Sequence, residues 1–243
     1  MPISEPEPLL EVRGVRAGYK GVDILHGVDL VVHEGEIVCV VGPNGSGKST
    51  VFKAVYGLID VREGSVLMAG KDITSYGPQQ LLTSGIALVP QLPAIFPGMT
   101  VYENIELGMY LERDKKKIRH RVDEVFDLFP KLAARRKQQA GTLSGGERRA
   151  LEIGRSLMLK PRLVLMDEPS VGLSPILVRE VFEQLRSLRD ETGLTFLIIE
   201  QNARSGLELS DRGYVIERGR VTYSGAGGEL LADAEVRKTF LGV

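Results

Sequence analysis

The segment Gly42–Thr50 is the feature that most constrains what this chain can fold into. It fits the pattern G-x-x-x-x-G-K-[ST], and it lies between a β-branched apolar run, Ile37–Val41, and apolar residues at helical spacing from Val51 onward. Glycine allows consecutive backbone N–H groups to turn inward at the start of a helix, where they form an anion-binding nest. The pattern therefore predicts a phosphate-binding loop between a buried strand and a helix.

The same loop supplies candidate ligands for a nucleotide. Lys48 would pair with the β- and γ-phosphates of ATP, and the hydroxyl of Ser49 would bind Mg²⁺. Because Lys48 would also neutralise charge on the transferred phosphoryl group, we count it among the catalytic candidates. ATP and Mg²⁺ are the predicted cofactors, and the predicted ATP-binding residues of the loop are Gly42, Pro43, Asn44, Gly45, Ser46, Gly47, Lys48, Ser49 and Thr50.

Adjacent carboxylates, Asp167 and Glu168, end a second apolar run that starts near Arg162. Neighbouring residues of a strand point to opposite sides, so the two carboxylates have different tasks. Asp167 can reach Mg²⁺ through water, and Glu168 can polarise an attacking water. An Asp-Glu-Pro sequence alone is more often a capped turn. Its combination with the phosphate loop favours the catalytic interpretation.

The distribution of apolar runs predicts an α/β fold. Continuous runs, typical of strands buried on both faces of a parallel sheet, alternate with helical patterns. We expect a mainly parallel core sheet, an antiparallel β lobe on the N-terminal side and an α-helical lobe at about 92–143, all within one domain of residues 1–243. Further predicted strands are Leu9–Val15, Val28–Val32, Ile86–Val89, Leu163–Met166 and Phe196–Ile199, with a hairpin of Gly213–Ile216 and Val221–Tyr223. Predicted helices are Ile118–Phe129, stopped by Pro130, Glu147–Leu159, and a short one from Glu229.

Composition excludes several classes of protein. The formal net charge of −1 argues against a nucleic-acid binder that neutralises many phosphates. The single cysteine, Cys39, excludes an intramolecular disulfide framework. Met1–Pro8 lacks the apolar stretch of a secretory signal, and no apolar run approaches the roughly 20 residues that span a bilayer. We therefore expect any membrane role to depend on partner subunits.

The sequence Leu143–Glu147 (L-S-G-G-E) opens the second predicted helix. Ser144 and Glu147 have the spacing of a capping box, which starts ordinary helices. Two glycines in a first turn, however, cost about 1 kcal/mol each in helix propensity. Bare backbone at the positive end of a helix dipole suits close approach to a phosphate.

With this motif the chain resembles the ATP-binding-cassette family, whose signature is LSGG(Q/E), over nearly its whole length. The resemblance implies that two cassettes dimerise head to tail and that Ser144, Gly145, Gly146 and Glu147 cap the γ-phosphate held by the other subunit. It implies that Tyr19 stacks on adenine and that Gln91 contacts Mg²⁺ and senses a membrane partner. Candidates for the groove that receives a helix of that partner, about half of which we expect to be ordinary core, are Phe96, Met99, Tyr102 and Met109.

Two positions depart from the commonest cassette. Gln201 stands where histidine usually contacts the γ-phosphate, and Ser174 stands where aspartate usually ends the loop. Glutamine can donate a hydrogen bond but carries no charge, so Gln201 remains a catalytic candidate, with a degenerate site as the alternative. The sequence Glu200–Ala203 is similar to that of branched-chain amino-acid importer ATPases and their urea-transporter relatives. Ser170–Pro175 and Val236–Gly242 are similar to the F-type subunit of that group.

The expected function is that of an ATP-hydrolysing motor subunit at the cytoplasmic face of the membrane, which drives branched-chain amino-acid import. Expected partners are a second cassette (identical or related), integral membrane permease subunits and, indirectly, a substrate-binding protein; no nucleic acid is expected. Import of urea or amides, a soluble cassette ATPase acting on ribosomes or DNA, and a small-molecule kinase are the alternatives.

Overall fold

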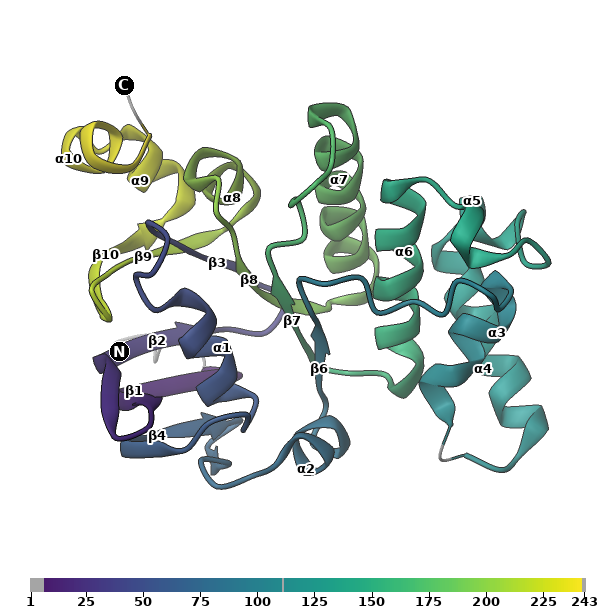
Figure 1. The fold of residues 1–243 in the computed structure, drawn as a ribbon, viewed down its shortest axis with the longest axis horizontal. Helices are drawn as coiled ribbons and strands as arrows, with labels where there is room; N and C mark the ends of the chain where they lie inside the picture. Colours follow the sequence, from purple (N-terminus) through teal and green to yellow (C-terminus); the bar gives the residue numbers. More distant parts are fainter. Residues whose placement is uncertain (1–6, 111, 242–243) are drawn as a thin grey trace, which may run out of the picture.

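The computed structural model describes residues 7–110 and 112–241 and contains two sheets (Figure 1). The smaller is antiparallel with strand order β2-β1-β4-β5, and the larger has the order β10-β9-β3-β8-β7-β6. Strands β9, β3, β8, β7 and β6 are parallel to one another, and β10 is antiparallel to β9. The strands are β1 (Leu10–Tyr19), β2 (Val22–Val32), β3 (Ile37–Val41), β4 (Val61–Met68), β5 (Lys71–Asp72), β6 (Ile86–Val89), β7 (Leu163–Asp167), β8 (Thr195–Ile199), β9 (Arg212–Glu217) and β10 (Arg220–Ala226).

Helices cover both faces of the larger sheet, and a group of them extends to one side (Figure 1). They are α1 (Lys48–Val55), α2 (Pro78–Thr83), α3 (Val101–Glu106), α4 (Lys115–Leu128), α5 (Pro130–Ala133), α6 (Gly145–Ser156), α7 (Pro175–Thr192), α8 (Ala203–Leu209), α9 (Gly227–Ala232) and α10 (Ala234–Val236). Short 3₁₀ turns follow α3 and α6, another precedes α6, and Arg237–Leu241 is a π-helical turn. None of the helices in the described part of the chain combines the length and the apolarity that crossing a bilayer requires.

The core sheet separates two hydrophobic clusters because alternate residues of each strand point to opposite faces. On one face, Val38 and Val40 of β3 pack with α1 and with the antiparallel sheet. On the other face, Ile37 and Cys39 pack with α6, α7 and α8 and, through them, with α3 and α4. Phosphate loop and signature therefore belong to helices on opposite faces of the sheet.

The predicted α/β architecture, with a mainly parallel sheet, an antiparallel lobe and a helical lobe, is confirmed. Several bounds differ from the prediction. Helix α4 begins at Lys115, where Asp114 caps it, and ends at Leu128; Pro130 then starts α5 at its first position, which proline tolerates. Helix α6 ends at Ser156, and a 3₁₀ turn continues it to Leu159. Strands β4 and β5 and helices α2, α7 and α8 were not predicted.

Candidate nucleotide site

Four neighbouring strands bring the sequence-predicted residues to one edge of the sheet. In the order β3-β8-β7-β6 all four are parallel, so their carboxyl ends lie side by side. Beyond β3 lies the phosphate loop, and Gln201 follows β8. Asp167 and Glu168 end β7, and Gln91 follows β6. Ligands of α/β sheets bind at such an edge, outside the carboxyl ends of the strands.

The phosphate loop is closed around the ammonium group of Lys48. Its Nζ donates hydrogen bonds to the carbonyl oxygens of Gly42 (2.7 Å) and Pro43 (3.0 Å). Burial lowers the pKa of Lys48, while the charges of Glu168 and Asp167 act in the opposite direction. Gly47 precedes α1 with φ of 108°, and a Cβ atom on Gly42 would lie 2.1 Å from the carbonyl oxygen of Ile216. Glycine is therefore required at both ends of the loop.

The polar atoms at this edge fit a magnesium–nucleotide complex. Ser46 Oγ and Asp167 Oδ1 are buried without a hydrogen-bond partner, so both are available to a ligand. Burial, followed by the charge of Glu168, raises the pKa of Asp167, and Lys53 and Lys48 oppose that rise. Nowhere in residues 7–110 and 112–241 do three or more His, Cys, Asp or Glu side chains gather as a metal cage. Mg²⁺ commonly binds through one or two protein oxygens together with substrate phosphates and water, which this set can supply.

Glu168 is held by neighbours on both sides. Its backbone N–H donates to the carbonyl of Ile199 (2.9 Å), and its Oε2 accepts a hydrogen bond from Gln91 Nε2 (2.7 Å). Its φ of 48° lies in the left-handed region, which is costly for a residue with a side chain; residues held in this way cluster at functional sites, although Lys20, Ala69, Lys160 and Arg218 of this chain share the region elsewhere. The structure thus brings Gln91, Asp167 and Glu168 together.

The remaining sequence-predicted residues of this edge are more exposed. Tyr19, at the end of β1, has 41% of its surface exposed, and Lys53 Nζ of α1 lies 5.4 Å from its ring centroid. Gln201 is exposed. Ser174 is the N-cap of α7, where its side chain accepts from the N–H of Leu177 (3.5 Å). Serine and aspartate are both favoured N-caps, which accounts for one of the two departures noted in the sequence.

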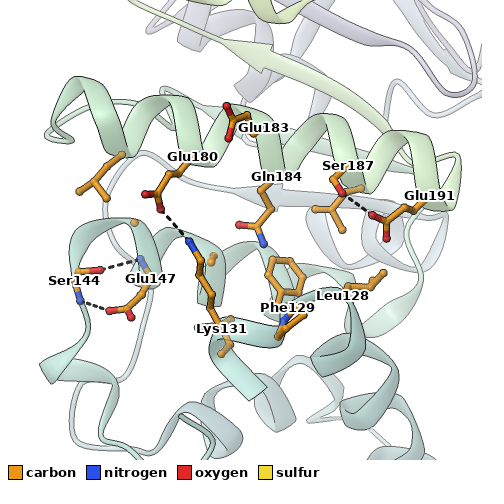
Figure 2. A pocket seen from close by; sticks show the side chains of 17 residues that line it. Leu128, Phe129, Lys131, Ser144, Glu147, Glu180, Glu183, Gln184, Ser187 and Glu191 are labelled. Atoms are coloured by element: carbon orange, nitrogen blue, oxygen red, sulfur yellow. Dashed lines mark hydrogen bonds and ion pairs between the residues drawn. The ribbon is translucent and has the colours of Figure 1, made fainter. Parts of the chain in front are cut away.

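The signature begins α6 and is shown in Figure 2. Ser144 and Glu147 form the predicted capping box: Ser144 N–H donates to Glu147 Oε2 (2.8 Å), and Glu147 N–H donates to Ser144 Oγ (3.3 Å). A Cβ atom on Gly145 would lie 2.9 Å from the Leu173 side chain, and one on Gly146 would lie 3.1 Å from that of Leu177. The glycines therefore also allow α6 to pack closely on the start of α7, a reason that sequence reasoning missed.

Beside the signature, a cleft of about 690 Å³ is lined by residues of α5, α6 and α7 (Figure 2). Its floor is apolar and includes Phe129 and Val181. Lys131 reaches across it to Glu180, with Nζ 3.3 Å from Oε2, and both side chains are largely exposed. The cleft extends to Ser144 at the start of the signature helix.

A buried ion pair joins the signature helix to the loop that carries Gln91. Arg149 and Glu152 of α6 pair at 2.9 Å, and their side chains are 7% and 3% exposed. Arg149 also donates to the carbonyl of Pro90 (3.2 Å), and Glu152 accepts from the N–H of Ala94 (2.8 Å). This link was not predicted from the sequence. Two charged residues on the apolar stripe of a helix were the signal that could have revealed it.

A groove of about 760 Å³ lies between the end of β6, the following loop and the end of α6. Phe96, Tyr110 and Leu159 line it and expose 51%, 69% and 40% of their surface. Of the four groove candidates from the sequence, only Phe96 is on this surface. The other three are partly buried; Tyr102 and Met109 pack against the core, and Tyr102 stacks on Phe126.

Comparisons with known proteins agree with this arrangement. The sequence pattern of the family described as ABC transporter matches residues 25–171. The chain is 40% identical over 235 residues to a probable branched-chain amino acid transport ATP-binding protein, LivF, of Archaeoglobus fulgidus, covering 97% of this chain and 99% of that protein. It is 40% identical to the high-affinity branched-chain amino acid transport ATP-binding protein BraG of Pseudomonas aeruginosa, covering 96% of this chain and 100% of that protein. It is 33% identical to the lipopolysaccharide export system ATP-binding protein LptB of Haemophilus influenzae, covering 96% of this chain and 97% of that protein.

Solved structures show the same fold. The ADP conformation of MJ1267, an ATP-binding cassette of an ABC transporter, superposes with a TM-score of 0.86 at 30% identity, covering 98% of this chain and 100% of that one. The cbiO1 protein of Clostridium perfringens, part of the ABC transporter complex cbiONQ, gives a TM-score of 0.87 at 27% identity, covering 96% and 94%. The chain therefore belongs to the ABC transporter family, as an ATP-binding subunit that hydrolyses ATP for a transporter with membrane components.

Proposed function

We propose that this subunit drives import of branched-chain amino acids from the cytoplasmic face of the membrane, together with permease subunits and, indirectly, a substrate-binding protein. The observation that supports this choice of substrate is the 40% identity, over nearly the whole chain, to two ATPases named for branched-chain amino acid transport. Urea or amides are the alternative, favoured by the similarity of Glu200–Ala203 to urea-transporter relatives. The similarity to LptB leaves the subunit's ATPase role unchanged but points to a different cargo.

The proposed reaction is hydrolysis of ATP to ADP and phosphate at the edge formed by β3, β8, β7 and β6. Lys48 leaves the carbonyls of Gly42 and Pro43 to pair with the β- and γ-phosphates, and backbone N–H groups of the glycine-rich loop would bind them as well. Glu168, held by Gln91, polarises the attacking water. Tyr19 stacks on adenine.

The unpartnered Asp167 Oδ1, the Ser49 hydroxyl and Gln91 would hold Mg²⁺, directly or through water. When bound, this ion neutralises charge on the phosphate oxygens. Residues of the chain then have complementary tasks: Lys48 orients the phosphates, and Glu168 takes the proton of the water.

The working unit in this proposal is a dimer of cassettes, identical or related. Ser144, Gly145, Gly146 and Glu147 of one subunit would cap the γ-phosphate on the phosphate loop of the other. The packing supports this, because α1 and α6 of one chain lie on opposite faces of the core sheet. A signature on the opposite face of the sheet from its own phosphate loop can serve a nucleotide held by a second subunit.

Gln201→Ala is expected to lower kcat about tenfold or more while changing ATP affinity less than twofold. Gln201 follows β8, between the phosphate-loop strand and the strand of Glu168, where its amide can donate to the γ-phosphate as charge develops. Steady-state phosphate release and fluorescent-nucleotide binding measure the two quantities. A loss of affinity that equals the loss in kcat/KM would reduce Gln201 to a ground-state contact.

The substrate is tested by uptake. Cells that carry the transporter are expected to accumulate labelled leucine, and cells that lack this subunit should lose that accumulation, with urea uptake unchanged. The reason is that ATP hydrolysis by this subunit is the energy source for the membrane subunits. The reverse pattern, with urea uptake lost and leucine uptake kept, would overturn the amino-acid assignment.

The same uptake experiment, with a matched pair of variants, also tests which surface of the subunit binds the permease. We propose that the groove around Phe96 receives a helix of a permease subunit. Phe96→Glu should abolish uptake while the ATPase of the isolated subunit stays unchanged. Leu58→Glu places the same charge on an apolar side chain, 51% exposed, that lies outside this groove, and it should retain uptake. Equal uptake by both variants would refute docking at Phe96.

A further inference from the structure

Glu200 is a buried carboxylate that none of the roles above uses. It follows β8, the strand between the phosphate-loop strand and the strand of Glu168, and none of its surface is exposed. Its backbone N–H donates to the carbonyl of Val40 (3.1 Å), so the main chain is fixed to β3. Its carboxylate accepts two hydrogen bonds from Ser170, one from the N–H (3.1 Å) and one from Oγ (2.7 Å). The side chain thus joins the end of β8 to the loop after β7.

A carboxylate is a costly choice for this position. Among residues 7–110 and 112–241, no lysine, arginine or histidine forms a salt bridge with Glu200. Burial raises the pKa of its carboxyl from the ordinary 4.5 to about 7, although the bonds from Ser170 act in the opposite direction. Gly206 of α8 packs against both Cys39 and Glu200, since a Cβ atom there would lie 2.7 Å from Cys39 Sγ and 3.0 Å from the Glu200 Cβ. Buried charge without a counter-charge opposes folding, which favours a functional reason for Glu200.

Through its bonds to Ser170, Glu200 fixes the backbone that follows Glu168 in the chain. That residue has the left-handed φ of 48°, and its own N–H is tied to the carbonyl of Ile199. Only Pro169, whose ring fixes its φ, separates it from Ser170. The strained residue is therefore anchored before and after by consecutive residues of one chain segment, Ile199 and Glu200. Residues in sparsely populated backbone regions persist only when their surroundings over-determine them.

We propose that Glu200 is a positioning residue for ATP hydrolysis, whose bonds to Ser170 set the place of the Glu168 carboxylate relative to Gln201. The inference rests on the proposed roles of Glu168 and Gln201. Gln201 is the next residue in the chain. The same short segment therefore carries both the Glu200 carboxylate, which binds Ser170, and the Gln201 amide proposed to contact the γ-phosphate. A displacement of a reacting group by about 1 Å can cost on the order of a hundredfold in rate.

The test is a double-mutant cycle on the purified full-length protein with Glu200→Ala and Ser170→Ala. Each single variant is expected to lower kcat about tenfold or more, with ATP affinity within twofold of wild type, because the phosphate loop is untouched. The double variant should be no worse than Glu200→Ala alone, since both changes break the same contact. Additive losses, or a kcat within twofold of wild type in both single variants, would overturn the proposal.

Two further variants separate positioning from general stability. Glu200→Gln keeps an oxygen that can accept from Ser170 and should retain a larger part of kcat than Glu200→Ala. Ile198→Val is a conservative change of a fully buried neighbour on β8, and it should lower the melting temperature without lowering kcat. If Ile198→Val and Glu200→Ala follow one relation between melting temperature and kcat, the role is structural only. Should Glu200→Ala fail to fold, the half-buried Ser170→Ala still carries the test.

Whether the effect of Glu200 depends on Glu168 is tested by introducing Glu200→Ala into the Glu168→Gln variant. Glu200→Ala should not lower the residual turnover of Glu168→Gln any further, because its effect passes through the Glu168 carboxylate. A further tenfold loss would show that Glu200 acts by another route. Wild-type turnover by Glu168→Gln alone would instead remove the proposed role of Glu168, so the two failures are distinguishable.

Discussion

Glu168→Gln is expected to lower ATP turnover by at least about a hundredfold, the range that general bases contribute. The amide has nearly the size of the carboxylate, and its oxygen can still accept the hydrogen bond that Gln91 now gives to Glu168 Oε2. It cannot accept the proton of an attacking water. Because Lys48 and the backbone of the phosphate loop are unchanged, ATP should still bind. A nucleotide that is bound and not hydrolysed should then hold two subunits together.

Three measurements check this result: phosphate release, binding of a fluorescent ATP analogue, and size-exclusion chromatography with and without ATP. Glu183→Gln is the matched control, because Glu183 is an exposed residue of α7 with no salt bridge to the described residues. It should behave as wild type in all three. Turnover by Glu168→Gln at the wild-type rate would contradict the catalytic role.

Ser144→Arg is expected to produce a loss of the same size by a different route. Ser144 is exposed at the start of α6, on the face of the sheet opposite to α1. An arginine there would fill the space that a phosphate from a second subunit must enter. ATP affinity of the isolated subunit should therefore stay within twofold of wild type, whereas ATPase activity should fall at least about a hundredfold, as when transition-state donors are removed. The double variant with Glu168→Gln should no longer dimerise with ATP.

Loss of the helix cap alone must be separated from this effect. Removing an N-cap side chain costs about 1 kcal/mol of stability, which cannot by itself account for a hundredfold loss of rate. Ser144→Asp retains a favoured cap but brings a negative charge to the expected γ-phosphate, so it should be as inactive as Ser144→Arg. Ser224→Arg, an exposed serine of β10, is the control for the added charge and should remain active. Full activity of Ser144→Asp would contradict the composite site.

The parts of this molecule that were predictable from the sequence are those whose signals are local. The phosphate loop, the capping box of α6 and the continuous apolar runs of β3, β7 and β8 each lie within a few consecutive residues. Strand β4 was missed because Arg62, Glu63 and Gly64 are exposed near its start, so that, apart from Val61, its apolar residues lie in its second half. Strand β1 continues to Tyr19 through irregular pairing near Gly14 and Gly18, where the alternation of polar and apolar residues is broken.

The contacts that complete the candidate site are of long range in the chain. Glu200 meets Ser170 across 30 positions, and Arg149 meets Pro90 across 59. Neither partner has a neighbouring residue that identifies the other, and only the strand order β8-β7-β6 brings them together. From sequence alone, both charged residues appear as unexplained polar positions in apolar segments.

The cleft beside the signature has a mechanical consequence. Where α5 faces α7, the charged bridge across the opening is the Lys131–Glu180 pair, and an exposed pair of this kind contributes about 0–1 kcal/mol. Such a bridge can break and re-form within one catalytic cycle without setting its rate. Movement of α5 relative to α7 therefore costs little at this ion pair, whereas the start of α6 remains held to α7 by the close packing of Gly145 and Gly146.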